Sequence, residues 1–291
     1  TVYRRVVHVS GRVDQNAPVS LGYYSWLGAP ASALGPQLRF IALDTRSKET
    51  ASGRMDWVQL GWLYNQLRQA LCQHQAVILF AHHPPADVWP SALSHMLDRF
   101  PNLVGYFYGH GHVNTEATWR NAPDGFALIQ TGSIADYPQV ARRVRVWFGS
   151  PSGSGTSETW PAGIDWEFVR PRGTATDSGE RLDAYLSATR DDSFQEYRST
   201  QFHGVTGPWR EWLHDLVPMV SHFESITQAE YAQENLHSGP MGVNVSFADI
   251  GQTDPELIFG EEQLKSTNEV RRLLGLDPIR DRCDASPSPE S

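Results

Sequence analysis

Short apolar runs in the first half of the chain alternate with longer stretches that repeat at helical spacing. Leucines at every third or fourth position predict a helix over 56–73, and Asp56 with Gln59 has the spacing of a capping box at its start. A second helix is predicted over 91–100. Strands are predicted at 38–43, 76–80, 104–108, 115–119, 126–130 and 142–148. Strands that alternate with helices in this way favour an α/β fold.

The pattern changes after Phe148, where a run of Ser, Gly and Pro begins. This composition is typical of a flexible linker, so we expect a first domain over 1–148 and a linker over 149–179. Residues 180–291 then form a mostly helical C-terminal extension that ends in a disordered tail. Its helices are predicted at 181–198, 208–236 and 261–274.

The composition limits the kinds of site that the chain can hold. It is 40% hydrophobic and 20% charged, as in globular proteins, and no apolar run approaches the roughly 18 to 20 residues of a membrane helix. We therefore expect no membrane partner, and we predict no particular compartment. Cys72 and Cys283 are the only cysteines, so a metal site must be built from histidine and oxygen ligands.

The net charge of −9 is distributed unevenly along the chain. Residues 1–148 hold 13 Lys and Arg against 9 Asp and Glu, a balance of +4, whereas the remaining residues hold 11 against 24, a balance of −13. The first part can attract an anionic substrate, and the acidic second part argues against a nucleic-acid-binding surface there.

Three histidines follow predicted strands directly. His82 comes after 76–80, and His110 and His112 come after 104–108. Loops at strand ends are where α/β folds present functional side chains, and a His-x-His pair in extended backbone points both rings to the same side. Gly109 and Gly111 leave room for a tight turn and for an ion. Since neutral imidazole is a good ligand for zinc, iron or manganese, these histidines predict a metal site.

The order of these motifs resembles that of the calcineurin-like metallophosphoesterase superfamily. The resemblance covers about 22–148 and rests on the segments 39–45, 59–63, 81–85, 109–112 and 131–139, with Ala-His-His-Pro-Pro and Gly-His-Gly-His as its clearest motifs. It implies part of a two-sheet α/β sandwich that hydrolyses a phosphomonoester or a phosphodiester with two divalent metal ions, Mn, Fe or Zn.

The resemblance also assigns roles to individual histidines. His82 and His110 would bind one ion and His112 the other, while His83 would support the ligands or face the substrate. The family's three other motifs precede the matched region, and none occurs in this sequence. We therefore expect the chain to be the C-terminal half of the domain, inactive until its missing N-terminal half supplies the remaining ligands.

Other interpretations remain open. The same fold can serve as a non-catalytic scaffold or protein-interaction module. A metallo-β-lactamase-like hydrolase is disfavoured because the sequence has no His-x-His-x-Asp-His string. The acidic C-terminal part can also bind a protein partner through apolar side chains at helical spacing, although such a stripe is more often core: Trp209, Trp212, Leu213, Leu216 and Phe223.

Overall fold

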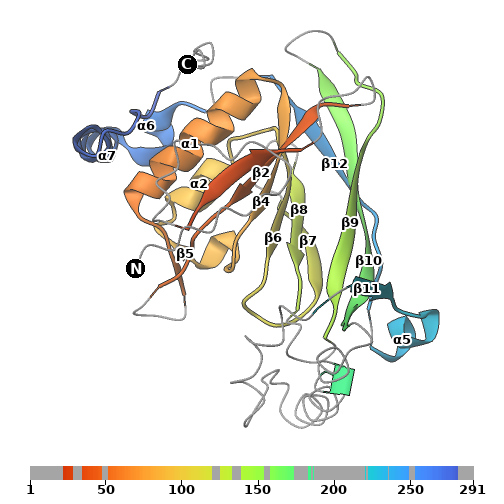
Figure 1. Cartoon of the computed structure of the whole chain (residues 1–291). Coiled ribbons are helices and arrows are strands. Elements are labelled where there is room, and N and C mark those ends of the chain that lie inside the picture. The colour runs from red at the N-terminus through yellow and green to blue at the C-terminus, as the bar shows by residue number, and fades with distance from the viewer. Residues whose placement is uncertain are drawn as a thin grey trace, which may run out of the picture.

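The chain folds into an α/β structure with two packed sheets, shown in Figure 1. The computed structural model describes residues 22–28, 35–47, 52–119, 125–132, 139–153, 158–173, 183–184, 186, 220, 222–234, 236–248 and 253–280. Within these ranges, helices cover one face of the first sheet and the second sheet lies against the other face.

The first sheet has six strands in the order β1-β2-β4-β6-β8-β7. The inner strands β2, β4, β6 and β8 run parallel, and the edge strands β1 and β7 run antiparallel to them. Their bounds are β1 Tyr24–Leu27, β2 Gln37–Ala42, β4 Gln75–Phe80, β6 Leu103–Tyr108, β7 Thr115–Trp119 and β8 Phe126–Gln130. The five strands predicted between 38 and 130 are therefore confirmed to within a residue or two.

Helix α1 (Trp57–Cys72) packs on the first sheet through its row of leucines, which are almost fully buried. The Asp56 side chain accepts a hydrogen bond from the Gln59 backbone N–H at 2.7 Å, so half of the predicted capping box is present. The other half is wrong, because the Gln59 side chain bonds the backbone of Asp44 instead, at 2.9 and 2.8 Å. Helix α2 (Ala92–Leu97) lies within the predicted 91–100 and is shorter.

The second sheet corrects the expectation of a flexible linker over 149–179. Residues Thr159–Arg172 form β10, a strand of 14 residues that pairs with β9 (Ala141–Phe148), β11 (His222–Ser225) and β12 (Met241–Ser246). Ile164, Trp166 and Phe168 alternate along β10 and are buried, which explains why this segment is a strand. The Ser/Gly-rich stretch lies between β9 and β10, two strands that pair antiparallel.

The C-terminal part joins the same core rather than forming a separate helical extension. It contributes β11 and β12 to the second sheet, together with α5 (Gln228–Gln233), α6 (Pro255–Phe259) and α7 (Glu261–Leu273). The helix predicted at 261–274 is confirmed as α7. The helix predicted at 208–236 is wrong where β11 forms, and its earlier part lies outside the described residues, as do the tail and nearly all of 181–198.

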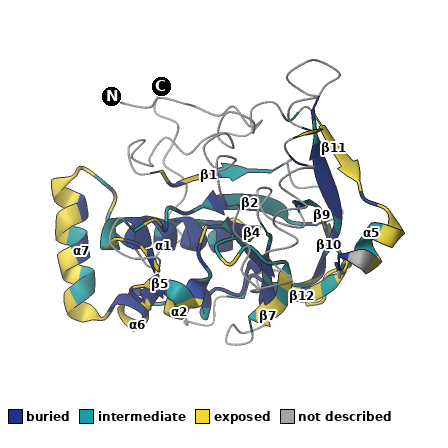
Figure 2. Ribbon diagram, turned by 90° about the horizontal axis from the view of Figure 1, so that it is seen from below, coloured by how far each residue is buried: buried dark blue, intermediate teal, exposed yellow. Residues whose placement is uncertain are grey.

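Helices α6 and α7 lie beside α1 on the outer side of the first sheet (Figure 1). The Arg271 guanidinium donates to the Val58 carbonyl at 2.8 Å, and the Tyr64 hydroxyl donates to the Thr253 carbonyl at 2.6 Å. Figure 2 shows α7 at the edge of the molecule with a largely exposed face, whereas α1, on its inner side, is largely buried. None of the described helices meets the length and apolarity needed to cross a bilayer.

An apolar cavity of about 540 Å³ separates part of the two sheets. Leu38, Phe40, Ile78, Phe80 and Phe107 of the first sheet line one side, and Arg142, Val144 and Val146 of β9 line the other. The rings of Trp26, Phe40, Phe80 and Phe107 form a row of contacts across the first sheet, with neighbouring centroids 5.2–6.2 Å apart. Ala81, Tyr108 and Thr131 lie at one end of the cavity, where the strands of the first sheet finish.

The hydrogen bond from Tyr64 of α1 to the Thr253 carbonyl should contribute to the stability of the fold. Tyr64→Phe removes the hydroxyl that bonds the Thr253 carbonyl, and we expect the free energy of unfolding to fall by about 1 kcal/mol. Chemical denaturation of the two proteins measures this difference. Tyr23→Phe is the matched control, because the buried Tyr23 hydroxyl has no hydrogen-bond partner among the described residues, so its removal is neutral or stabilising. Equal losses in both variants would contradict the role given to the Tyr64 hydroxyl.

Candidate metal centre

Two neighbouring parallel strands deliver the histidines to one edge of the first sheet. β4 ends at Phe80 and β6 ends at Tyr108, and the two strands pair in parallel, so their carboxyl ends lie together. The hydrogen-bond ladder continues into the loops: Ala81 N–H donates to Phe107 O at 3.0 Å, and Gly109 N–H donates to His82 O at 3.1 Å. His82 and His110 are therefore brought together by backbone pairing alone.

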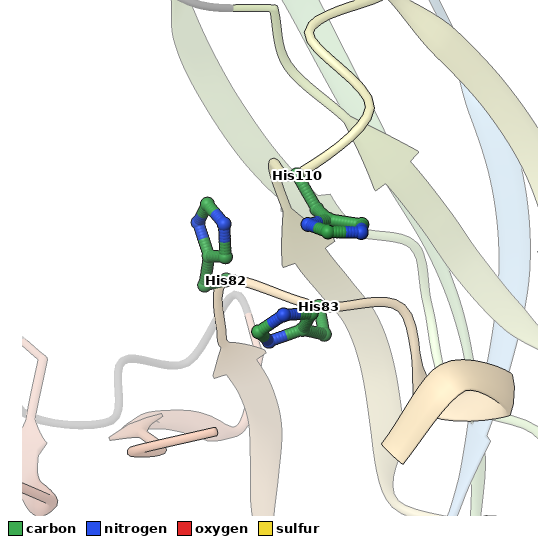
Figure 3. Close-up of side chains that lie close together, drawn as sticks. All are labelled: His82, His83 and His110. Atoms are coloured by element: carbon green, nitrogen blue, oxygen red, sulfur yellow. The ribbon is translucent and has the colours of Figure 1, made fainter. Parts of the chain in front are cut away.

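His82, His83 and His110 form a compact cluster, shown in Figure 3. Each offers a ring nitrogen, and these nitrogens lie within 4.8 Å of one another. The ring centroids of His82 and His110 are 5.3 Å apart, and those of His83 and His110 are 4.5 Å apart. Imidazoles this close can share an ion after small rotations about their side-chain bonds, so the donor set fits a divalent metal that accepts nitrogen ligands.

His83 is the most firmly held of the three. Its ring is buried, and its Nδ1 lies 2.9 Å from the Thr45 hydroxyl, which is itself buried just after β2. The Tyr106 hydroxyl donates to the His83 carbonyl at 2.9 Å. Gly53, in the short strand β3 (Gly53–Arg54), packs so closely that a side chain there would meet the His83 ring at 2.8 Å. Contacts from three separate segments fix this residue, two at its ring and one at its backbone carbonyl.

The Gly109–His112 turn has a backbone shape that the sequence pattern did not predict. His110 and His112 have φ angles of 70° and 53°, in the left-handed region that non-glycine residues seldom adopt. Gly111 N–H donates to Gly109 O at 2.9 Å and closes the turn. The expectation that the His-x-His pair is extended is therefore wrong, and His112 does not share the compact cluster with His110.

Two carboxylates lie in this region: Asp87 is near the histidine cluster, and Asp44 lies at the same edge of the sheet. Asp87, in the 3-10 turn η1 (Pro85–Asp87), places an oxygen 3.7 Å from His110 Nε2, close enough to orient this ring or to serve a bound cation. Asp44 follows β2 but accepts two hydrogen bonds from the Arg46 guanidinium, at 2.9 and 2.7 Å. This pairing, led by the side-chain hydrogen bonds, lowers the pKa of Asp44.

Partial burial, and then the neighbouring His83, His110 and His112, lower the pKa of His82 below its ordinary value of 6.5. The contribution of His112 indicates that this ring lies near His82 although it is outside the cluster. A lowered pKa keeps the imidazole neutral at neutral pH, which is the form that coordinates a metal.

The structure brings together two of the three histidines predicted as ligands, His82 and His110. His83, predicted to support the ligands or face the substrate, lies in the cluster, and His112 lies outside it. Their roles as metal ligands remain predictions. Sequence reasoning missed Thr45 and Asp87, although both lie in or next to segments that carried the resemblance. The sequence offered one signal for each residue. Thr45 lies just after β2, and Asp87 lies just after the His-His-Pro-Pro run.

Comparison with known proteins leaves the family undetermined. No protein-family model matches the chain, and no curated protein matches it. The resemblance to calcineurin-like enzymes therefore rests on the sequence motifs alone.

The pKa of His82 predicts how stability depends on pH in the metal-free protein. Below about pH 6.5 the unfolded chain takes up a proton at His82 before the folded protein does, so the free energy of unfolding falls as the pH is lowered through this range. We expect His82→Gln to reduce this slope, measured by chemical denaturation between pH 5 and 8. His95→Gln, on the exposed surface of α2, is the control. An unchanged slope in His82→Gln would contradict the lowered pKa.

Proposed function

We propose that this chain is the histidine-bearing part of a metal-dependent phosphoester hydrolase of the calcineurin-like type. The observation that carries the proposal is the cluster of His82, His83 and His110 at the carboxyl edge of two adjacent parallel strands. The Ala-His-His-Pro-Pro and Gly-His-Gly-His motifs build this edge. Two sheets with helices on the outer face of the first are in keeping with the proposed sandwich.

The proposal gives each histidine a task. His82 and His110 hold one divalent ion, Mn, Fe or Zn, and His112 contributes to the second. His83, bonded to Thr45, keeps the cluster in place beside the first ion. Bound divalent ions supply an activated water at neutral pH and neutralise charge on the phosphoryl oxygens of a phosphomonoester or phosphodiester. The net positive balance of residues 1–148 favours the approach of such an anion.

The proposed centre needs ligands beyond the described histidines. Zinc sites usually have three or more protein ligands with supporting hydrogen bonds, and a centre of two ions needs more nitrogen and oxygen donors than the described histidines offer. The cavity between the sheets gives a place for the segment that carries them. It ends at Ala81, Tyr108 and Thr131, and the first two of these precede the histidine loops. We propose that a short segment of the N-terminal half of the domain enters this cavity and helps to complete the site.

The proposal predicts activity once the site is complete. When the N-terminal half is supplied, as upstream sequence fused ahead of Thr1, the protein should hydrolyse an aryl phosphate or a bis-aryl phosphodiester with added Mn²⁺. His110→Ala should lower kcat/KM at least 100-fold, because loss of a ligand leaves an ion under-coordinated. With nitrophenyl esters as the substrates, the rate of nitrophenol release measures this effect.

Controls separate this prediction from its alternatives. His95→Ala, an exposed histidine on α2, should leave the rate unchanged. The 291-residue chain alone should show no turnover with Mn²⁺. Strong turnover by this chain alone would contradict the need for further ligands, and a completed protein that binds metal without hydrolysing either ester would favour the non-catalytic scaffold.

The open cavity predicts that the chain alone is weakly stable. Covering the apolar side chains that line the cavity is worth about 2 to 3 kcal/mol at about 25 cal/mol per Å², which is a sizeable part of the roughly 5 to 15 kcal/mol of a typical domain. We expect the 291-residue chain to bind a hydrophobic dye and to unfold at low denaturant concentration, and the N-terminal half to reverse both effects. A high, cooperative midpoint without dye binding would contradict the proposed role of the cavity.

A further inference from the structure

The side chain of Gln130 supports the turn that carries His110. Gln130 is the last residue of β8 and is paired with Tyr108 of β6, the residue before the turn. Its side-chain amide is buried and donates to the Gly109 carbonyl at 2.9 Å. The Thr115 hydroxyl of β7 donates to the Gln130 side-chain oxygen at 3.3 Å and fixes the direction in which this amide points.

The backbone of Gln130 is anchored to the second sheet by Arg142. The Arg142 guanidinium donates to the Gln130 carbonyl at 2.9 Å and pairs with Glu116 of β7 at 2.5 Å. Its side chain is 2% exposed and lies against the ring of Phe168, 4.6 Å from the ring centroid. Arg142 therefore fixes the backbone of Gln130 at the place where the two sheets meet.

Gly111 shows how closely the amide fits the turn. A Cβ atom at this position would lie 2.4 Å from the Gln130 side-chain nitrogen, far inside van der Waals contact. Gly111 has no positive φ angle, so its backbone accepts an L-residue and the obstacle is the Gln130 amide itself. An alanine at position 111 would therefore displace the Gln130 amide and break its hydrogen bond to the Gly109 carbonyl.

We propose that Gln130 is a positioning residue: its amide fixes the Gly109–Gly111 turn in the left-handed shape that aims the His110 imidazole at His82 and His83. The link to metal binding rests on the proposed function. Residues that orient a ligand commonly change metal affinity 10- to 100-fold when they are replaced, because the ligand then samples directions that do not reach the ion.

Gln130→Met tests the proposal, because methionine keeps the length of the side chain and removes the donated hydrogen bond. In the 291-residue chain we expect Co²⁺ to bind about tenfold more weakly, measured by visible absorption and calorimetry. In the metal-free protein we expect the NMR signals of the Gly109 and Gly111 amides and of the His110 ring to shift. This second measurement does not depend on whether a metal binds.

Asn102→Leu is the matched control. The fully buried Asn102 amide donates to the Gln75 carbonyl at 3.0 Å, the same kind of hydrogen bond, at the amino end of β6. Its loss should lower the free energy of unfolding about as much as Gln130→Met does, but should leave Co²⁺ affinity and the His110 signals unchanged. A merely structural role for Gln130 would make the two variants alike in every measurement.

Gly111→Ala gives a second test that does not require an apolar residue in the polar site. We expect it to weaken Co²⁺ binding and shift the His110 signals when Gln130 is present, and to have little effect in the Gln130→Ala background, where the collision is absent. Additive effects, or unshifted turn signals in Gln130→Met, would overturn the proposal. Failure of the unaltered chain to bind Co²⁺ would instead count against a metal site built by these histidines alone, while the metal-free spectra would still decide the role of Gln130.

Discussion

The parallel pairing of β4 with β6 is the constraint on which the candidate site depends. Its ladder runs past the ends of both strands, through Ala81 to Phe107 and through Gly109 to His82. These backbone bonds hold the two histidine loops in register without any contribution from side chains. The side-chain contacts of Thr45, Tyr106 and Gln130 then set the directions of rings whose positions the sheet has already determined.

The sequence could predict the parts of this arrangement that depend on local pattern. The apolar runs before His82 and His110 identified their strands, and parallel strands in an α/β fold place their carboxyl ends at one edge. The cluster itself was predicted less well. Spacing alone cannot give the left-handed backbone at His110 and His112. At His110 it is accompanied by the bond from the Gln130 amide to Gly109 and by the closure from Gly111 to Gly109.

Long-range contacts account for the other differences between pattern and structure. Gln59 has the spacing of a capping box, yet its side chain bonds Asp44, which a local pattern cannot anticipate. Residues 159–172 follow the Ser/Gly-rich stretch that indicated a linker. The buried residues that alternate along this segment face the first sheet, as Ile164 does where it packs on Gly105. The alternation therefore identifies a strand only once the position of the first sheet is known.

The position of β10 has a consequence for the order in which the protein folds during synthesis. Its partner β9 lies just before it in the chain, so this pair can form as soon as the ribosome has released residue 172. Its other edge pairs with β12 and β11, which follow some 50 to 90 residues later. Pairings at such separation form slowly, and an open strand edge invites association with other chains in the meantime. The nascent chain is therefore most exposed to misassembly between the release of β10 and the arrival of β12.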